Sequence, residues 1–260
     1  MNLGCFNCSK YFGSMWTSKC GNKVFGKFMT EDINKCNRDN WVKANLRNIP
    51  AGLTILDAGA GMLYYKKYCS HLNYISQDFG EYDGKGDKRS LSAKRKWKAR
   101  WDIKSDIAKI PLPNNSVDIV LCTEVFEHLP NPIDAIKEFS RLIKINGKLI
   151  LTAPVCSLTH MSPFFYYNGF SRYYYEKYLP ENGFKIESMQ YNGNWFLYLY
   201  QELNRFNFMA KKYTKTNPIS RFIITIICRL LAIACYVIGK SDKGSKEILS
   251  FGIHIYARKI

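Results

Sequence analysis

The stretch TILDAGAGMLYY (residues 54–65) places two glycines, two residues apart, directly after a short apolar run that ends in Asp57. An apolar run that stops at turn residues is typical of a buried strand. Glycine adopts positive φ without strain and lets the backbone approach a ligand closely. The sequence therefore predicts a strand over residues 53–58 that ends at a ligand-binding turn.

Further apolar runs follow this strand, separated by helical patterns. Helices are expected over about 31–48, over 63–69 directly after the glycines, and over 131–146. The alternation of strands and helices predicts an α/β fold with a doubly wound, mostly parallel, Rossmann-like sheet. The further strands are expected at residues 72–79, 100–106, 116–124, 147–154, 183–191 and 250–259.

Three successive predicted strands end on an acid, at Asp57, Asp78 and Asp106. Ligands of doubly wound sheets bind at the carboxyl ends of the strands, and an acid after the second strand can accept both ribose hydroxyls of an adenosine. Asp106 and the apolar Ile107 could hold an adenine. The third glycine of a dinucleotide fingerprint is missing, because Tyr64 stands at its position. A cationic nucleoside fits this pattern better than a pyrophosphate.

Several motifs in this order resemble the class I S-adenosylmethionine-dependent methyltransferases of the type 11 group, similar to those encoded with bacterial surface-polysaccharide genes. The resemblance covers about residues 50–190. It implies S-adenosyl-L-methionine as the cofactor and a seven-stranded sheet whose last strand is antiparallel. The motifs are ILDAGAG (55–61), YISQDF (74–79), SDIAKIPLPNNSVDIVLCTEVFEHLPNP (105–132) and EFSRLIKINGKLILTAP (138–154).

The same resemblance divides the chain and assigns the cofactor site. Residues 1–50 would be an N-terminal helical lead-in, and residues 51–260 the methyltransferase domain, with a helical insertion at about 193–248. Leu63 departs from the pattern, since the family often has a glycine there. The implied cofactor-binding residues are Asp57, Ala58, Gly59 and Gly61 near the methionine part, Asp78 and Phe79 near the ribose, Asp106 and Ile107 at the adenine, and Thr123 and Glu124 beneath the sulfonium.

Two histidines are placed to act as a general base if the acceptor of the methyl group is a hydroxyl. His128 follows the fourth predicted strand and His160 follows the fifth, and histidine titrates near neutrality. Both are candidate catalytic residues, whereas Glu127 is expected to face solvent or to start a helix. The aromatic residues between 164 and 175 could stack on sugar rings, close over the cofactor, or pack a helix on the sheet.

These features predict O-methylation of a sugar or a lipid-linked glycan. Methylation of RNA is an alternative, and a catalytically inactive cofactor-binding scaffold is another. The net charge of +17 favours an anionic partner. The basic segment 87–100 contains Trp97 and could meet RNA, anionic lipid or a phosphate-linked sugar, or simply be solvated. Nucleic acid ranks below a phosphorylated glycan or lipid because no RNA-binding module is recognisable.

The apolar run FIITIICRLLAIACYVI (222–238) has three interpretations. It could pack on protein, including a second copy in a homodimer, lie on an anionic membrane, or span a bilayer. Its 17 residues fall short of the roughly 20 that a spanning helix needs. Arg221, Thr225 and Arg229 would share one stripe of a helix. The expected location is the cytoplasm, at the inner face of the membrane.

The nine cysteines are scattered along the chain, and the first twenty residues carry no apolar signal-like run. Reduced thiols are therefore expected. Cys5 and Cys8, with Cys20 and Cys36 downstream, give only a weak zinc-knuckle pattern because the second pair is widely spaced. No metal site is predicted.

Overall fold

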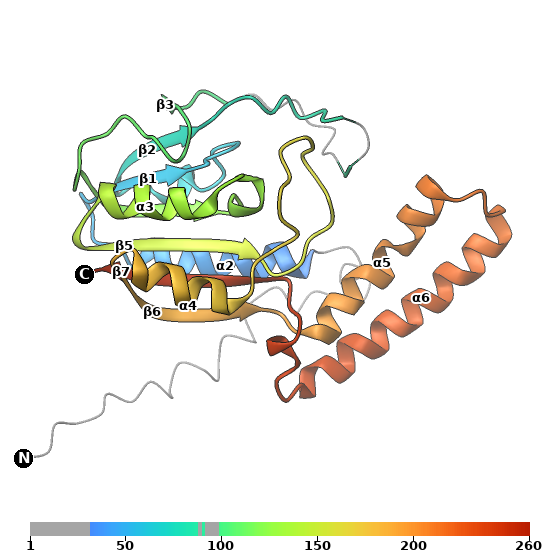
Figure 1. The fold of residues 1–260 in the computed structure, drawn as a ribbon. Helices are drawn as coiled ribbons and strands as arrows, with labels where there is room; N and C mark the ends of the chain where they lie inside the picture. The colour runs from blue at the N-terminus through green and yellow to red at the C-terminus, as the bar shows by residue number, and fades with distance from the viewer. Residues whose placement is uncertain (1–31, 88–89, 92–98) are drawn as a thin grey trace, which may run out of the picture.

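The computed structural model describes residues 32–87, 90–91 and 99–260. Its centre is a seven-stranded sheet in the order β3-β2-β1-β4-β5-β7-β6 (Figure 1). The first five strands are parallel, and β7 runs antiparallel between β5 and β6. This is the predicted Rossmann-like fold with an antiparallel last strand. The strands are β1 (Thr54–Ala58), β2 (Asn73–Asp78), β3 (Ile103–Lys104), β4 (Val117–Thr123), β5 (Ile143–Pro154), β6 (Phe184–Asn192) and β7 (Gly252–Lys259).

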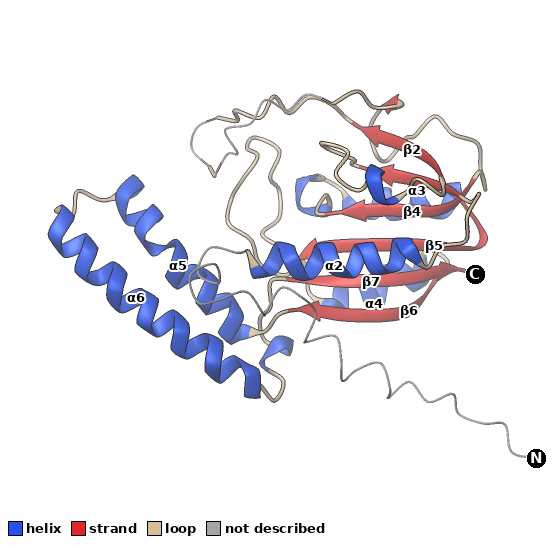
Figure 2. Cartoon of the chain, turned by 180° about the vertical axis from the view of Figure 1, so that it is seen from behind, coloured by secondary structure: helices blue, strands red, loops and turns tan. Residues whose placement is uncertain are grey.

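Helices cover both faces of the sheet. Helix α2 (Ile33–Arg47) lies across one face (Figure 2), where its Asp32 cap accepts a hydrogen bond from the Lys35 N–H. Its apolar side joins a core cluster with residues of β1, β4 and β5. Helices α3 (Pro132–Leu142) and α4 (Arg172–Glu181) cover the opposite face over the larger core cluster. Both faces of the parallel strands are therefore buried, as a doubly wound sheet requires.

The helix predicted over residues 63–69 is wrong. The chain turns after the glycines and forms only the short 3₁₀ helix η3 (Lys66–Tyr68). Leu63 has a φ of 58°, which a helix does not accommodate. The Tyr64 and Tyr65 hydroxyls both donate to Asp39 of α2, at 2.6 and 2.9 Å. These contacts fix the segment as a turn against α2.

Between β6 and β7 the chain forms a helical hairpin of α5 (Trp195–Tyr213) and α6 (Pro218–Ile238), followed by two short 3₁₀ helices, η5 (Gly239–Ser241) and η6 (Ser245–Glu247). The hairpin projects from the body at the end where β5 and β6 stop (Figures 1 and 2). Asn194 closes its base, since it caps α5 through the Leu197 N–H and donates to the Gly239 carbonyl at 3.1 Å. Helix α6 begins four residues before the apolar run 222–238 and ends with it.

One face of α6 packs on α5 and the other is exposed. Cys228 and Ala232 are its buried residues. By length and composition, the segment Pro218–Gly239 could cross a membrane, and only 17% of its most apolar window is buried in the structure. The exposed large apolar residues of α6 are Ile219, Phe222, Ile223, Ile224, Ile226, Ile227, Leu230, Leu231, Ile233, Val237 and Ile238.

The cysteines partly contradict the expectation of reduced thiols. Cys36 is disulfide-bonded. Cys69, Cys122, Cys156, Cys228 and Cys235 are free. Cys5, Cys8 and Cys20, which give the weak zinc pattern, lie outside the described residues.

Candidate functional site

The turn after β1 forms one wall of the site. Gly59 and Gly61 have φ values of +73° and 51°, in the region that favours glycine. The Gly59 N–H donates to the Gln77 carbonyl of β2 at 2.9 Å. A Cβ at Gly59 would lie 2.5 Å from Cγ2 of Val125. Glycine is therefore needed here both for the backbone turn and for close packing against the segment after β4.

Asp57 lies inside the sheet rather than at the turn surface. Its carboxyl is buried and accepts the Tyr74 hydroxyl at 2.6 Å. Burial raises the pKa of Asp57 to about 7, and the nearby charge of Asp78 adds to the effect. Ala58, the last residue of β1, is fully buried beside it. Asp57 can thus bind a cation near neutral pH only by giving up a proton.

Asp78 ends β2 and is oriented by two backbone groups. Its Oδ2 accepts the Gly61 N–H at 2.8 Å and its Oδ1 accepts the Gly80 N–H at 2.9 Å. A carboxylate has about four acceptor positions, so each oxygen keeps one lone pair. Two lone pairs on neighbouring oxygens suit a ribose diol. Phe79, the next residue, packs edge to face on Phe164 of the loop after β5, with ring centroids 4.9 Å apart.

The two residues predicted to hold the adenine, Asp106 and Ile107, lie in different environments, one exposed and the other buried. Strand β3 ends at Lys104, two residues before the predicted end, and Asp106 is exposed. One oxygen of Asp106 accepts the Ala108 N–H at 2.9 Å, which fixes the turn. Ile107 is 6% exposed and belongs to the main core. The role of this pair at an adenine stays a prediction.

Glu124 is held from two elements. It follows Thr123, the last residue of β4, and its φ is 54°. Its Oε1 accepts the Thr152 hydroxyl of β5 at 2.9 Å, and its Oε2 accepts Nη1 of Arg38 at 2.8 Å. Burial disfavours the charged guanidinium, yet the Glu124 carboxylate raises the pKa of Arg38 above its ordinary value. Helix α2 therefore takes part in the site.

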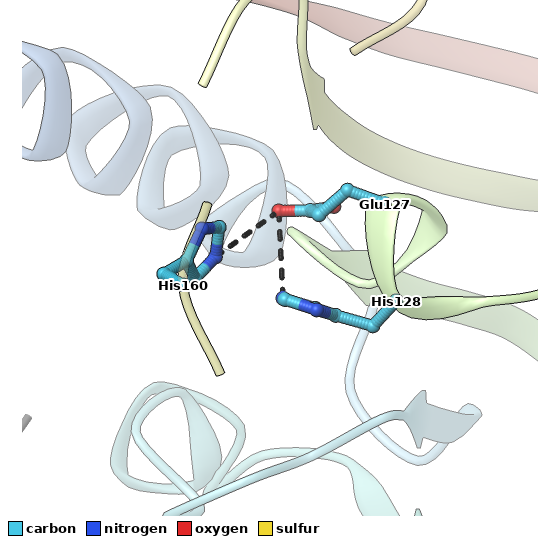
Figure 3. Close-up of side chains that lie close together, drawn as sticks. All are labelled: Glu127, His128 and His160. Carbon is cyan, nitrogen blue, oxygen red and sulfur yellow. Dashed lines mark ion pairs between the residues drawn. The ribbon is translucent and has the colours of Figure 1, made fainter. Parts of the chain in front are cut away.

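The two candidate bases, His128 and His160, lie together in the structure although 32 positions separate them in the sequence. The rings of His128 and His160 meet edge to face with centroids 4.7 Å apart. Glu127 lies between them (Figure 3), with its Oε1 3.7 Å from Nε2 of His128 and 3.9 Å from Nε2 of His160. Together these three side chains form the Glu127–His128–His160 cluster.

The expectation that Glu127 faces solvent is wrong, because its side chain is only 2% exposed. It sits in the 3₁₀ helix η4 (Phe126–His128), and the loop after β5 covers it. That loop is tied down where the Tyr166 N–H donates to the Glu127 carbonyl at 2.9 Å. Burial raises the pKa of the Glu127 carboxyl, and the charge of Glu124 raises it further. Burial lowers the pKa of His128 to about 4.

Sequence reasoning missed two further side chains at this edge. Arg38 binds Glu124 across 86 positions, a separation at which no local pattern exists. Trp101 donates its indole N–H to the Gly61 carbonyl at 2.8 Å. No signal pointed to Trp101 either, since it stands at the start of the predicted third strand and not at the end that reaches this edge. Most of the basic segment 87–100, with Trp97, lies outside the described residues.

Residues 56–151 match the family model of the methyltransferase domain. A stretch of 98 residues is 31% identical to the uncharacterised protein MJ0638 of Methanocaldococcus jannaschii, and it covers 37% of this chain and 39% of the archaeal one. The chain thus spans well under half the length of this curated relative.

Two solved structures share the fold at a TM-score of 0.50 and 15% identity. One is a candidate methyltransferase, BH2331 of Bacillus halodurans C-125, with 85% of this chain and 99% of that chain covered. The other is the [4+2]-cyclase SpnF, with 86% and 80% covered. The similarity supports a Rossmann-like methyltransferase fold and, with the domain match, indicates S-adenosylmethionine as the cofactor. A cyclase on the same fold shows why the acceptor chemistry has to be argued from the site.

Proposed function

We propose that the chain is an S-adenosylmethionine-dependent methyltransferase that methylates a hydroxyl of a sugar, carried on a lipid-linked glycan at the inner face of the membrane. The observation that carries the proposal is the meeting of His128 and His160 beside Glu127, at the carboxyl edge of β4 and β5. A hydroxyl acceptor must lose a proton during methyl transfer, and this cluster offers nitrogen atoms at the edge where the cofactor residues lie.

The residues of β1, β2 and β4 would bind and orient the cofactor. When bound, S-adenosylmethionine supplies a methyl group on a positively charged sulfur. Asp78 offers its two remaining lone pairs to the ribose hydroxyls. Glu124, fixed by Arg38 and Thr152, would help to bind and orient the positively charged end of the cofactor. The methyl donor and the acceptor oxygen could then be aligned for an in-line displacement.

His160 is better exposed than His128 for contact with an acceptor. The side chain of His160 is 30% exposed, and that of His128 is 11% exposed. Nδ1 of His160 is engaged by the Leu158 carbonyl at 2.9 Å, which leaves Nε2 for the acceptor side. We therefore place His160 next to the acceptor hydroxyl and His128 behind it.

A cavity beside the same loop supports a sugar acceptor. It has a volume of about 250 Å³ and combines aromatic rings with polar groups at the start of α3. Sugars are bound through the stacking of their apolar faces on aromatic rings together with hydrogen bonds at their edges. The Tyr167 N–H donates to the Glu127 carbonyl at 3.3 Å, so the wall of the cavity adjoins the cluster. Its lining residues are Asn131, Pro132, Ile133, Asp134, Lys137, Tyr167, Phe170 and Tyr174.

The exposed face of α6 supports a lipid-linked acceptor. Helix α6 contains no acidic residue, and lysines stand before its start and after its end. Each basic residue near an anionic membrane surface contributes about 1 kcal/mol to binding. The hairpin leaves the body at the carboxyl edge of the sheet, so a membrane that received α6 would lie on the same side as the cluster.

Calorimetric titration of the full chain with S-adenosylmethionine and its demethylated product tests the cofactor. We expect micromolar binding that Asp78→Asn abolishes and that the exposed Asp134→Asn leaves intact. Incubation with lipid-linked glycans should then add one methyl to the acceptor. Methylation of RNA instead would refute the sugar acceptor. Binding without transfer to either class would favour the inactive scaffold, and no binding by folded protein would overturn the methyltransferase assignment.

Vesicle flotation of the full chain tests the membrane face. We expect binding to phosphatidylglycerol vesicles, weaker binding to phosphatidylcholine vesicles, and loss of binding in the double variant Ile227→Ser, Leu230→Ser. Ile145→Ser is the matched control, because Ile145 is as exposed (60%) but lies in β5, outside the hairpin. The membrane role of α6 is refuted if the double variant floats with the vesicles as well as the unmodified chain does. It is equally refuted if the unmodified chain floats with neither kind of vesicle.

A further inference from the structure

The Glu127–His128–His160 cluster brings three electron-pair donors to one point. Oε1 of Glu127 lies 3.7 and 3.9 Å from the two Nε2 atoms, and the three atoms all lie within 4.8 Å of one another (Figure 3). Neither distance is a hydrogen bond. The three side chains therefore point at one common spot without hydrogen-bonding to one another.

The tautomers of both histidines follow from their other nitrogens. Nδ1 of His128 lies 2.6 Å from the Phe164 carbonyl, and Nδ1 of His160 lies 2.9 Å from the Leu158 carbonyl. A carbonyl only accepts, so each Nδ1 carries the proton. In a neutral imidazole the Nε2 atom then carries a lone pair, and here both lone pairs face the Glu127 carboxyl. A carbonyl that fixes the tautomer in this way is the usual partner of a metal-binding histidine.

Among the described residues, Glu127 forms no ion pair with a lysine or arginine, and the charge of Arg38 acts on it only at longer range. Its Oε2 is buried and makes no hydrogen bond with any described residue. Within the described part of the chain, the ion pairs of Glu127 are those with the two histidines. A buried carboxyl group that faces two lone pairs is unfavourable as a carboxylate, so it either keeps its proton or shares a positive charge with the two nitrogens.

We propose that Glu127, His128 and His160 form a binding site for a divalent transition-metal ion of the zinc type. Two imidazoles and one carboxylate select such an ion over Mg²⁺ and Ca²⁺, which prefer all-oxygen ligands. Ligands of a tetrahedral ion at about 2.0–2.1 Å lie about 3.4 Å apart. The observed 3.7 and 3.9 Å, with all three atoms within 4.8 Å of one another, therefore require the side chains to close on the ion. Three protein ligands leave a fourth position open, as in catalytic zinc sites.

The role of the ion rests on the proposed function, whereas its binding does not. The ion would bind the acceptor oxygen and lower its pKa, so that the hydroxyl proton passes to solvent water. The oxygen–methyl bond then forms as the sulfur–methyl bond breaks, and the sulfonium becomes a neutral thioether. With the ion bound, His128 and His160 would act as ligands, and solvent water would replace them as the acceptor of the hydroxyl proton.

Titration of chelator-treated full chain with ZnCl₂, and with CoCl₂ followed by visible absorption, tests the site. The background carries Cys5→Ser, Cys8→Ser, Cys20→Ser and Cys36→Ser, so that thiols of the weak zinc pattern do not contribute. We expect one ion per chain at micromolar affinity or tighter, with a visible Co²⁺ band. His160→Ala and Glu127→Gln should weaken binding by more than about 100-fold, beyond the 10- to 100-fold typical of changes to residues that only orient a metal ligand.

Two controls separate the outcomes. His71→Gln removes a histidine that lies outside the cluster and should leave ion binding unchanged. Asp78→Asn should abolish binding of S-adenosylmethionine and leave ion binding intact, so the failure of one site is distinguishable from the failure of the other. The site is refuted if folded protein takes up no stoichiometric ion, or if His160→Ala and Glu127→Gln both bind it as tightly as the unmodified cluster. Methyl transfer that is unaffected by chelation would refute the role of the ion alone.

Discussion

The contact between Arg38 and Glu124 predicts that helix α2 stabilises the cofactor edge of the sheet. Nη1 of Arg38 donates to Oε2 of Glu124 at 2.8 Å, and the two side chains are 17% and 28% exposed. A hydrogen bond to a charged group contributes about 1.5–3 kcal/mol. We expect Arg38→Met to lower the free energy of unfolding by about 2 kcal/mol, because methionine keeps the apolar stem and removes only the guanidinium. In a chain of this size that corresponds to about 4–8 °C in Tm.

Urea unfolding of the single and double variants measures this contact. A cycle with Glu124→Gln should give a coupling energy of about 1–2 kcal/mol, since the carboxylate keeps only the Thr152 hydroxyl when Arg38 is lost. Lys137→Met is the matched control, because Lys137 pairs with Asp134 on the exposed surface and its removal should leave the unfolding midpoint unchanged. Arg38→Met should also weaken binding of S-adenosylmethionine about tenfold. A coupling energy near zero, or unchanged cofactor affinity, would refute the reasoning.

Three further outcomes follow from the same edge of the sheet. Gly59→Ala should lower Tm and abolish cofactor binding, because φ is +73° and the new Cβ would lie 2.5 Å from Val125; thermal unfolding and calorimetry check both effects. Asp57 has a folded pKa of about 7 against an ordinary 3.8, so the folded state keeps a proton that the unfolded state has lost between these values. Stability should therefore fall as pH rises from about 4 to 7, by at most about 4 kcal/mol, and Asp57→Asn should flatten the profile in urea midpoints. Trp101→Phe removes the donor to the Gly61 carbonyl and should weaken cofactor binding with little change in Tm, whereas unchanged affinity would show that this hydrogen bond does not shape the turn.

The sheet could be predicted because its signal is local. The buried strands read as continuous apolar runs, and the turn at Gly59 and Gly61 follows from the spacing of two glycines. The helix at 63–69 could not be excluded in this way, because Asp39 of a distant element holds the tyrosines that end it. Glu127 was misjudged for a related reason, since the loop that buries it comes more than thirty residues later.

The sequence placed the candidate residues at strand ends but gave no distances between them. Parallel strands bring their carboxyl ends to one edge, so Asp78, Glu124 and His128 could be expected there together. The meeting of His128 with His160 depends on the path of the loop after β5, which the Leu158 and Phe164 carbonyls fix. The path of such a loop produces no periodic pattern in the sequence from which it could be predicted.

Composition alone does not predict which face of α6 is exposed or what that face contacts. A helix of a soluble hairpin buries its large apolar residues and exposes its polar ones. Here the small residues Cys228 and Ala232 face α5, while residues such as Phe222 and Leu230 are 66% and 63% exposed. Exposed apolar patches of this extent mark an interaction surface. Because the same helix lacks acids and is flanked by lysines, we propose an anionic bilayer as the partner of this surface in preference to a second chain of net charge +17.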